Sequence, residues 1–520
     1  MSRRTPELFA AIHLGSEQVS LQIVEYTTIS DMKIIERASR QVTLGEETFK
    51  TGKLSFGAVA SICELLKGYR RTLTEYGVRD FRLLATTAVR EAQNQQYVID
   101  QIKVKTGFDV EVVDMPQEIF LKYITLYKTI EEGGLVNNHD GLLFVDISSG
   151  GLGITLNKGG AIRYQQNIHI GALRIKESFE KHQRESAHFH EALTEYIFST
   201  IDAVESELSQ RKIKYLILSG IETKLLLKML GREQLKKLEY VSLDDFYKLY
   251  QKVKGLNLPQ VMQTFNLSEA RAEMVLPTIV LYRQILALTT VEHIVIPADQ
   301  LIDGFMLKHI AEKSKDAWMG VIESQIISLT REIGAKYQHD TKHAEAVERY
   351  SLLLFDKMTR IHGLGKRERL LLKIACMLHD IGKFVSLRRH YFYSYRLIIS
   401  SDILGFSEEE KAVIANIAHY HSKGTPNDND QNYAVLSKPQ KVVAAKLAAL
   451  IRLADAIDRS HRQKVSDCEI AVKGDEVHIM VTSREDLSLE EWTFADKAEF
   501  FQDVYGIKPI LIRRAGWSNV

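Results

Sequence analysis

The decapeptide Ile374–Lys383, IACMLHDIGK, places a histidine and an aspartate inside an otherwise apolar helix. A buried carboxylate needs a counter-ion or a metal, because an isolated charge is too costly away from water. Two other apolar helical segments each carry one polar residue of the same kind, His343 upstream and Asp455 downstream. Together with His379 and Asp380 they form a mixed nitrogen and oxygen ligand set, which suits a divalent ion such as Mg, Mn, Fe, Co or Zn. The sequence therefore predicts a metal centre in a helical domain.

Composition sets the broad class of the protein. A chain of 520 residues with 45% hydrophobic and 26% charged residues is typical of a globular protein of about three or four domains. The net charge of +1 excludes a bulk electrostatic attraction to nucleic acid or to an anionic membrane. Three scattered cysteines indicate a reducing compartment, and the chain has no run of about 18 uncharged apolar residues. We therefore expect a cytoplasmic protein with no membrane span and no nucleic-acid partner.

Two stretches of the N-terminal half follow the same pattern. Residues 8–26 predict two strands joined at a turn, and residues 141–165 predict a strand ending near Asp146, a glycine- and serine-rich turn and a returning strand. His13 and Asp146 fall at equivalent places, which suggests an internal duplication into two α/β domains that face each other across a cleft. Turns of this composition expose backbone N–H groups that bind anions. The turn residues predicted to contact phosphate are Gly15, Ser16, Ser148, Ser149 and Gly150.

The segment Ala85–Ala92, ATTAVREA, is similar to the A-T-S-A-x-R-E-A segment of the Ppx/GppA phosphatases, the family of exopolyphosphatases and guanosine pentaphosphatases. The resemblance continues through NIHIGALR at 167–174, LIDGFML at 301–307 and LHDIGK at 378–383, and covers nearly the whole chain. The residues that it adds to the phosphate site are Thr86, Thr87, Arg90 and Asp146.

The resemblance also implies the domain plan. The fold class is an α/β N-terminal half of duplicated actin-like (ribonuclease H-like) domains, followed by an all-α HD domain and a small α+β C-terminal lobe. The implied limits are 1–134 and 135–310 for the two actin-like subdomains, 311–465 for the HD-type domain and 466–520 for the lobe.

Two positions depart from the cleft motifs of that family. His13 stands where the family has an aspartate, and Gly153 stands where its second loop closes with a glutamate. Glu118 matches the family's catalytic glutamate in a changed setting; the alternative is a first-turn glutamate stabilised by the helix dipole. Phosphoanhydride hydrolysis needs a base, a positioned water and donors for the developing charge. We therefore expect a cleft that is weakened or non-catalytic and still binds a phosphorylated ligand.

The C-terminal half resembles the HD-domain metal phosphohydrolases. The implied ligands of a Mg, Mn, Fe or Co ion are His343, His379, Asp380 and Asp455. The resemblance further implies that Asp380 accepts a proton from water and that Lys383 faces the phosphate. His390 and His421 are candidates for a second ion, or alternatively part of a polar rim, and Tyr393 replaces a family histidine.

Three functions follow from these features. The first is hydrolysis of phosphoanhydride bonds of polyphosphate or guanosine pentaphosphate in the cleft, with Glu118 as the catalytic carboxylate. The second places hydrolysis of a nucleotide or phosphate ester at the HD site, with the actin-like half as a sensor. The third is a non-enzymatic regulator that binds alarmone or polyphosphate. Family analogy adds the expectation of a homodimer.

Overall fold

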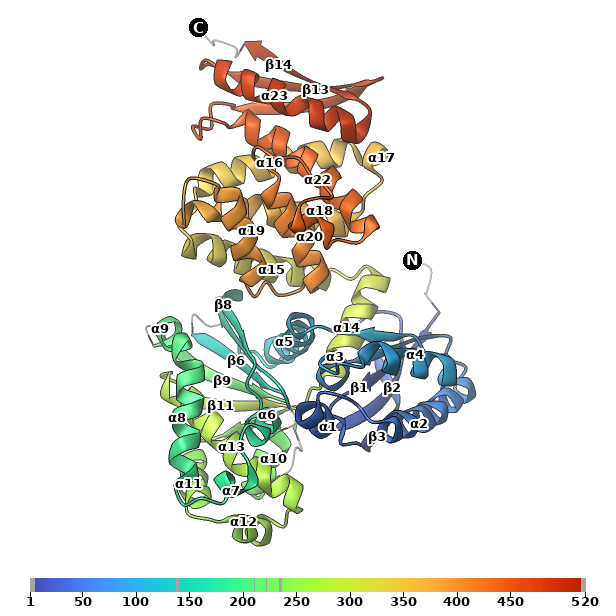
Figure 1. Ribbon diagram of the computed structural model, residues 1–520, viewed down its shortest axis with the longest axis vertical. Coiled ribbons are helices and arrows are strands. Elements are labelled where there is room, and N and C mark those ends of the chain that lie inside the picture. The colour runs from blue at the N-terminus through green and yellow to red at the C-terminus, as the bar shows by residue number, and fades with distance from the viewer. Residues whose placement is uncertain (1–4, 137–139, 210, 221, 233–235, 516–520) are drawn as a thin grey trace. The chain divides into compact units, whose positions relative to one another are not determined.

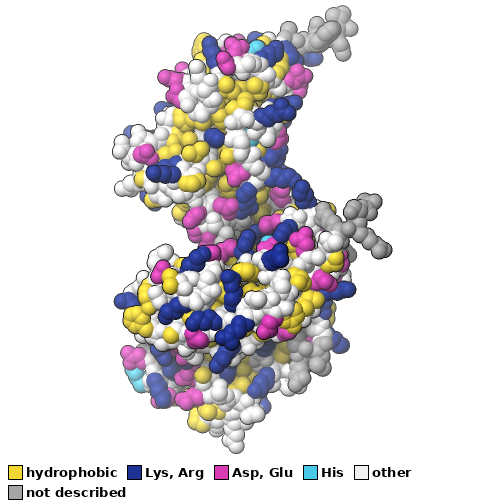
Figure 2. Space-filling view, turned by 90° about the vertical axis from the view of Figure 1, so that its right-hand side faces the viewer, with side chains coloured by type: hydrophobic (Ala, Val, Ile, Leu, Met, Phe, Trp, Pro, Cys, Tyr) yellow, Lys and Arg dark blue, Asp and Glu magenta, His cyan; other side chains and the backbone are white. Residues whose placement is uncertain are grey.

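The computed structural model describes residues 5–136, 140–209, 211–220, 222–232 and 236–515. The chain divides into two compact units between Ile326 and Ile327 (Figure 1). Within the described ranges, no helix combines the length and the apolar character that crossing a membrane would require. On the face drawn in Figure 2, basic and acidic side chains are interspersed, in keeping with the net charge of +1.

The first unit contains a sheet with the strand order β3-β2-β1-β4-β5. Its strands are β1 (Glu7–Leu14), β2 (Gln18–Tyr26), β3 (Lys33–Gln41), β4 (Asp80–Ala85) and β5 (Val110–Val112). β1 pairs antiparallel with β2 and parallel with β4. Apolar side chains of β1, β2 and β4 form one buried core with those of α2 and α4. The helices around this sheet are α1 (Leu44–Thr51), α2 (Phe56–Glu75), α3 (Thr87–Arg90), α4 (Gln95–Thr106), α5 (Met115–Glu132) and α14 (Leu301–Ser314).

A second sheet of the same unit has the order β10-β11-β9-β6-β7-β8. Its strands are β6 (Gly141–Ile147), β7 (Leu152–Lys158), β8 (Ala161–Ile168), β9 (Ile213–Ser219), β10 (Leu238–Val241) and β11 (His293–Pro297). The helices that follow it in sequence or cover it are α6 (Ala172–Glu177), α7 (Lys181–Arg184), α8 (Phe189–Ile201), η1 (Asp202–Val204), α9 (Glu205–Leu208), α10 (Glu222–Met229), α11 (Leu243–Lys254), α12 (Leu258–Phe265) and α13 (Glu269–Ala287). One continuous apolar core joins this sheet to α8, α11 and α13.

The two sheets repeat one topology. In each, an antiparallel three-stranded meander (β1-β2-β3, then β6-β7-β8) is extended by a parallel strand beside its first strand, β4 or β9. His13 and Asp146 are both the penultimate residues of the first strand, opposite Leu84 and Ser219 respectively. The repeated hairpin pattern of the sequence thus corresponds to a repeated sheet.

The second unit is helical up to its last third. After α15 (Trp318–Lys336), in which the division between units falls, its helices are α16 (Thr341–Lys357), α17 (Thr359–His362), α18 (Lys366–Leu378), η2 (Ile381–Phe384), α19 (His390–Ser400), α20 (Glu408–His419), α21 (Gln431–Ala434) and α22 (Lys438–Ile457). The chain then forms β12 (Asp467–Lys473), β13 (Glu476–Ser483), α23 (Ser488–Tyr505) and β14 (Lys508–Ala515). The three strands make one sheet in the order β12-β13-β14, and α23 packs along α22 (Figure 1).

Candidate functional site

A cavity of about 160 Å³ lies in the first unit, at the carboxyl ends of strands from both sheets. Strand ends of this kind are where α/β proteins place their ligands. The predicted residues that line the cavity are Gly15, Ser16, Thr86, Thr87, Glu118, Asp146, Ser148 and Ser149. Arg90 and Gly150 instead line a smaller recess beside it, which also contains Glu118. The fold therefore gathers most of the predicted set around one cavity and leaves Arg90 outside it.

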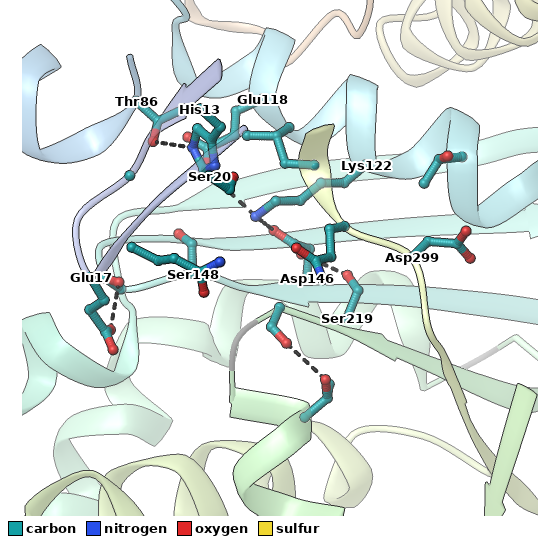
Figure 3. Close-up of a pocket in the computed structure, with 18 of the residues that line it drawn as sticks. His13, Glu17, Ser20, Thr86, Glu118, Lys122, Asp146, Ser148, Ser219 and Asp299 are labelled. Carbon is teal, nitrogen blue, oxygen red and sulfur yellow. Dashed lines mark hydrogen bonds and ion pairs between the residues drawn. The ribbon is translucent and has the colours of Figure 1, made fainter. Parts of the chain in front are cut away.

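His13 contributes no charge to this cavity. Its Nε2 lies 3.1 Å from the hydroxyl oxygen of Thr86 (Figure 3). Burial lowers the pKa of His13 to about 4, and the opposing influence of the nearby Glu118 does not compensate. The imidazole is therefore neutral at pH 7. At this position, where the family has a negatively charged aspartate, the protein has a neutral histidine that forms one hydrogen bond.

Lys122 brings a positive charge to the acids of the cavity. It lies one turn after Glu118 on α5, and its ammonium is 2.7 Å from Asp146 Oδ2 and 3.4 Å from Glu118 Oε1 (Figure 3). The helix begins here because the Asp114 carboxylate accepts a backbone N–H of the first turn, in which Pro116 also lies. Burial would lower the pKa of Lys122, but the two carboxylates outweigh burial and raise it. The ammonium therefore compensates both acids.

Glu118 has a cationic partner on each oxygen. Its Oε2 lies 3.2 Å from Arg90 Nη1, while Oε1 faces Lys122. Burial would raise the pKa of Glu118, but Lys122 and Arg90 outweigh it and hold this pKa below its usual value. Arg90 also donates to the carbonyl of Val113 at 2.6 Å. The guanidinium predicted to bind phosphate is thus engaged within the protein.

Packing fills the space at Gly153, where the family has its second acid. A Cβ added at Gly153 would lie 2.8 Å from Cδ1 of Ile119 and 2.9 Å from its Cγ2, so a side chain here would have to displace Ile119. Asp146 remains beside this point, with Oδ1 accepting from the Ser219 hydroxyl at 2.6 Å and Oδ2 paired to Lys122. Both oxygens of the surviving acid are therefore bonded inside the protein.

Glu17 and Asp299 also line the cavity, and Glu222 directly precedes the lining residue Thr223 in sequence. Glu17 accepts from the Ser149 hydroxyl at 2.9 Å and pairs with Arg271 at 3.1 Å. Glu222 is fully buried, and burial, reinforced by Glu17, raises its pKa to about 8. Glu222 is therefore mostly protonated at pH 7 and carries little negative charge.

The second unit gathers a different set of side chains. Four histidines donate from Nδ1 to fixed acceptors: His343 to Asp458 at 2.9 Å, and His379, His390 and His421 to backbone carbonyls three residues earlier. This bonding turns each Nε2 toward the centre, which is the orientation in which a histidine binds a metal. Two Nε2–Nε2 distances are short, 3.3 Å between His343 and His379 and 3.2 Å between His390 and His421.

Asp380 lies between these two histidine pairs. Its Oδ2 is 3.6 Å from His379 Nε2 and 3.8 Å from His343 Nε2, whereas its Oδ1 is 3.4 Å from His390 Nε2 and 3.5 Å from His421 Nε2. Among the described residues, the buried Oδ1 has no hydrogen-bond partner. Gly382, two residues later, lets the chain pass close to α19, because a Cβ here would lie 2.0 Å from the carbonyl oxygen of His390.

The residues present fit a divalent metal. Three groups of ligand atoms lie within bonding span of a common ion: His343 with His379 and Asp380, His379 with His421 and Asp455, and Asp380 with His390 and His421. A buried carboxylate oxygen without a partner, facing two imidazole nitrogens, is the arrangement that a bound cation satisfies. The predicted residues thus meet at one place, and the third group forms without Tyr393.

The electrostatics of this centre differ between its histidines. Burial lowers the pKa of His379 to about 3 and that of His390 to about 4, so both stay neutral. Burial would also lower the pKa of His343, but hydrogen bonds to Asp455 and Asp458 outweigh it and raise the pKa to about 9. A metal at His343 Nε2 would therefore have to displace a proton.

Several residues of these sites are not among those predicted from the sequence. Lys122 has the i,i+4 spacing to Glu118 that could have identified it. Asp458 follows Asp455 by three residues, and its role depends on contact with His343. His461 stacks on His343 with 3.6 Å between ring centroids, in a backbone conformation of positive φ (57°), and no sequence pattern indicated it. Lys497 comes from the lobe and pairs with Asp455.

The repeated sheets and the cavity at their strand ends define an actin-like α/β protein with a helical C-terminal region. The sequence pattern described as the Ppx/GppA phosphatase family matches residues 22–308, and that described as Ppx/GppA phosphatase, domain III, matches residues 327–496. The chain belongs to the Ppx/GppA phosphatase family, as predicted, and is thereby an enzyme of the hydrolase class.

Relatives of similar length are known. A guanosine-5'-triphosphate,3'-diphosphate pyrophosphatase of Photobacterium profundum is 22% identical over 474 residues, which cover 88% of each chain. The protein of the same name from Vibrio vulnificus is 21% identical over 92% of each chain. Among solved structures, a Ppx/GppA family member of Aquifex aeolicus aligns with a TM-score of 0.51 at 18% identity, covering 59% of this chain and 99% of its own. An exopolyphosphatase of Cytophaga hutchinsonii aligns with the same TM-score at 22% identity, covering 59% and 98%.

Proposed function

We propose that this chain is a phosphohydrolase with an intact HD-type metal centre and a degenerate actin-like cleft, and that turnover takes place at the metal centre. The substrate class is a phosphoanhydride, polyphosphate or guanosine pentaphosphate, in line with the names of its relatives. The observation that carries the proposal is the unpartnered Oδ1 of Asp380 between His390 and His421. The cleft then serves to bind a phosphorylated ligand.

Each residue of the centre has a role in this proposal. His343, His379, Asp380 and Asp455 hold one divalent ion, and Asp380 with His390 and His421 offers a place for a second. When bound, such an ion polarises a phosphoryl oxygen and lowers the pKa of water. Asp458 orients His343 by accepting its Nδ1–H. Lys383, which pairs with Asp380 and is about one-third exposed, is placed to contact the phosphate.

The cleft is proposed to be degenerate because its acids are compensated from within. Lys122 pairs with both Glu118 and Asp146, Arg90 pairs with Glu118, and Ile119 fills the space beside Gly153. A base whose two oxygens face cations is a weak proton acceptor, since its pKa is held down.

A second candidate function, turnover in the cleft with Glu118 as base, is favoured by one observation. Glu118, Thr86 and Ser148 line the same cavity, so a phosphate bound there would meet a carboxylate and two hydroxyls.

Three further expectations remain predictions. They are the four domains with limits at residues 134, 310 and 465, the cytoplasmic location and the homodimer.

The test is phosphate release from polyphosphate, guanosine pentaphosphate and a nucleotide panel, with Mg²⁺ or Mn²⁺. Wild type is compared with Asp380→Ala, Glu118→Gln and the control Asp356→Ala, whose exposed carboxylate pairs with Arg369. The proposal expects loss of turnover in Asp380→Ala alone. Loss in Glu118→Gln alone would place turnover in the cleft, and activity in both variants would contradict both candidates.

A further inference from the structure

A lysine of the C-terminal lobe reaches the metal centre of the helical domain. Lys497 lies on α23, which packs along α22, the helix that carries Asp455. Its side chain is only 9% exposed although it comes from a different element of the fold. The family pattern that matches the second unit covers residues 327–496, and Lys497 is the first residue beyond it.

The two oxygens of the Asp455 carboxylate face different partners, Lys497 and His343. The ammonium forms an ion pair with Oδ2 of Asp455 and donates to the carbonyl of His421 at 3.2 Å. The other oxygen, Oδ1, lies 3.3 Å from Nε2 of His343. One oxygen therefore faces the ligand atoms of the centre, and the other is held by a positive charge of the protein itself.

We propose that Lys497 is an internal counter-ion of the metal centre, which compensates Asp455 in the metal-free protein and weakens the hold of the centre on its metal. The inference rests on the proposed metal centre and concerns the regulation of its affinity. Lys497 acts through Asp455 and is therefore a positioning residue.

The physical argument has two parts. Removing one partner of a buried ion pair leaves a charge less well compensated, so without Lys497 the buried Asp455 of the metal-free protein would keep His343 as its partner and lose the ammonium. A divalent ion could then replace the lost positive charge beside Asp455, and its binding would no longer be opposed by the ammonium. Loss of Lys497 should therefore weaken the metal-free fold and strengthen metal binding at the same time.

The same helix offers a matched control. Glu490, also on α23, pairs with Lys464 at 3.0 Å, and the Lys464 side chain is 12% exposed. This pair ties the lobe to the loop after α22 and touches none of the proposed ligands. Lys464→Met thus removes a similarly buried lysine partner of α23 without altering the charge at Asp455.

The experiment measures Mn²⁺ binding by titration calorimetry and thermal unfolding with and without EDTA, on the full chain. For Lys497→Met we expect a Kd for Mn²⁺ at least about tenfold lower than wild type, a lower Tm in EDTA and a larger rise of Tm on adding Mn²⁺. Lys464→Met should lower the Tm equally with and without metal and leave the Kd unchanged. Lys497→Arg, which keeps the charge, should match wild type.

A Kd in Lys497→Met that is unchanged or higher would overturn the inference and leave the metal centre standing. Absence of Mn²⁺ binding by wild type would overturn the metal centre and the inference with it. If Lys497→Met does not fold, Lys497→Gln gives the same test, because glutamine keeps a donor for the His421 carbonyl and removes the charge. The tighter Kd is expected there too, and its absence counts against the inference.

Discussion

The cleft of the first unit and the centre of the second both pair their acids with lysines, Lys122 in the cleft and Lys383 and Lys497 in the centre, but they differ in the carboxylate oxygens that are left over. In the cleft, Lys122 lies between Glu118 and Asp146, so the carboxylates are compensated by the chain. In the centre, Asp380 keeps an oxygen without a hydrogen-bond partner among the described residues, facing two imidazole nitrogens. The comparison teaches that the acids alone do not define a metal or phosphate site. What separates the two sites is whether a buried carboxylate oxygen is left without a hydrogen-bond partner once the lysines have been placed.

The largest expected effect comes from removing the internal cation of the cleft. Lys122→Met leaves two buried acids without their shared partner, which should lower the free energy of unfolding of the first unit by about 3–5 kcal/mol. Urea unfolding followed by circular dichroism measures this loss. Lys128→Met, on the same helix with the half-exposed partner Glu132, should cost about 1 kcal/mol or less. Rescue of Lys122→Met by Mn²⁺ would show that the cleft also holds metal, and the contrast between the sites would fail.

A second prediction concerns the protonated acid behind the cleft. The pKa of Glu222 is raised from 4.5 to about 8, so the folded protein binds a proton that the unfolded chain releases above pH 4.5. Stability is therefore lost as pH rises from about 4.5 to 8. Glu222→Gln removes this loss and should stabilise the unit by an amount on the order of 3 kcal/mol at pH 7 and by little at pH 4. Thermal melts of both proteins across this pH range measure the difference. Equal Tm shifts at pH 4 and pH 8 would contradict the assignment.

A third prediction concerns metal binding at the centre of the second unit, which the cleft is not expected to share. Asp458→Asn removes the carboxylate that orients His343 and should weaken Mn²⁺ binding about 10- to 100-fold, as loss of a partner of a metal ligand usually does. Calorimetric titration measures the Kd, with Asp356→Asn as the control on the same domain. An unchanged Kd would mean that His343 is not a ligand.

The smallest effect is expected at Tyr393, where the family has a histidine. The group of Asp380, His390 and His421 forms without this residue. Tyr393→His should therefore leave the number of bound Mn²⁺ ions unchanged. The Kd should change by about twofold at most, because the substitution lies away from the metal contacts. Metal content by mass spectrometry is the measurement. A gain of one ion per chain would show that the centre of wild type is incomplete.

The sequence predicted much of the fold because hydrophobic periodicity is local. The repeated strand-turn-strand patterns correspond to the meanders β1-β2-β3 and β6-β7-β8, and the apolar helices carrying His343, His379 and Asp455 are α16, the end of α18 and α22. That Arg90 contacts phosphate stays a prediction, and the structure adds that its guanidinium bonds to Glu118 and to the carbonyl of Val113. That outcome depends on the path of α5, which the local pattern does not specify.

The sequence by itself determined the candidate ligands and their order, since a histidine or an aspartate within an apolar helix is costly to bury and is therefore conspicuous. It also determined the family, through motifs such as ATTAVREA and LHDIGK. Only the tertiary structure decided which acids are compensated. Lys122 meets Asp146 across 24 positions of sequence, and Lys497 meets Asp455 across 42. Contacts of that separation depend on how helices and sheets pack, because a side chain at a surface of one element finds its partner only when another element covers it.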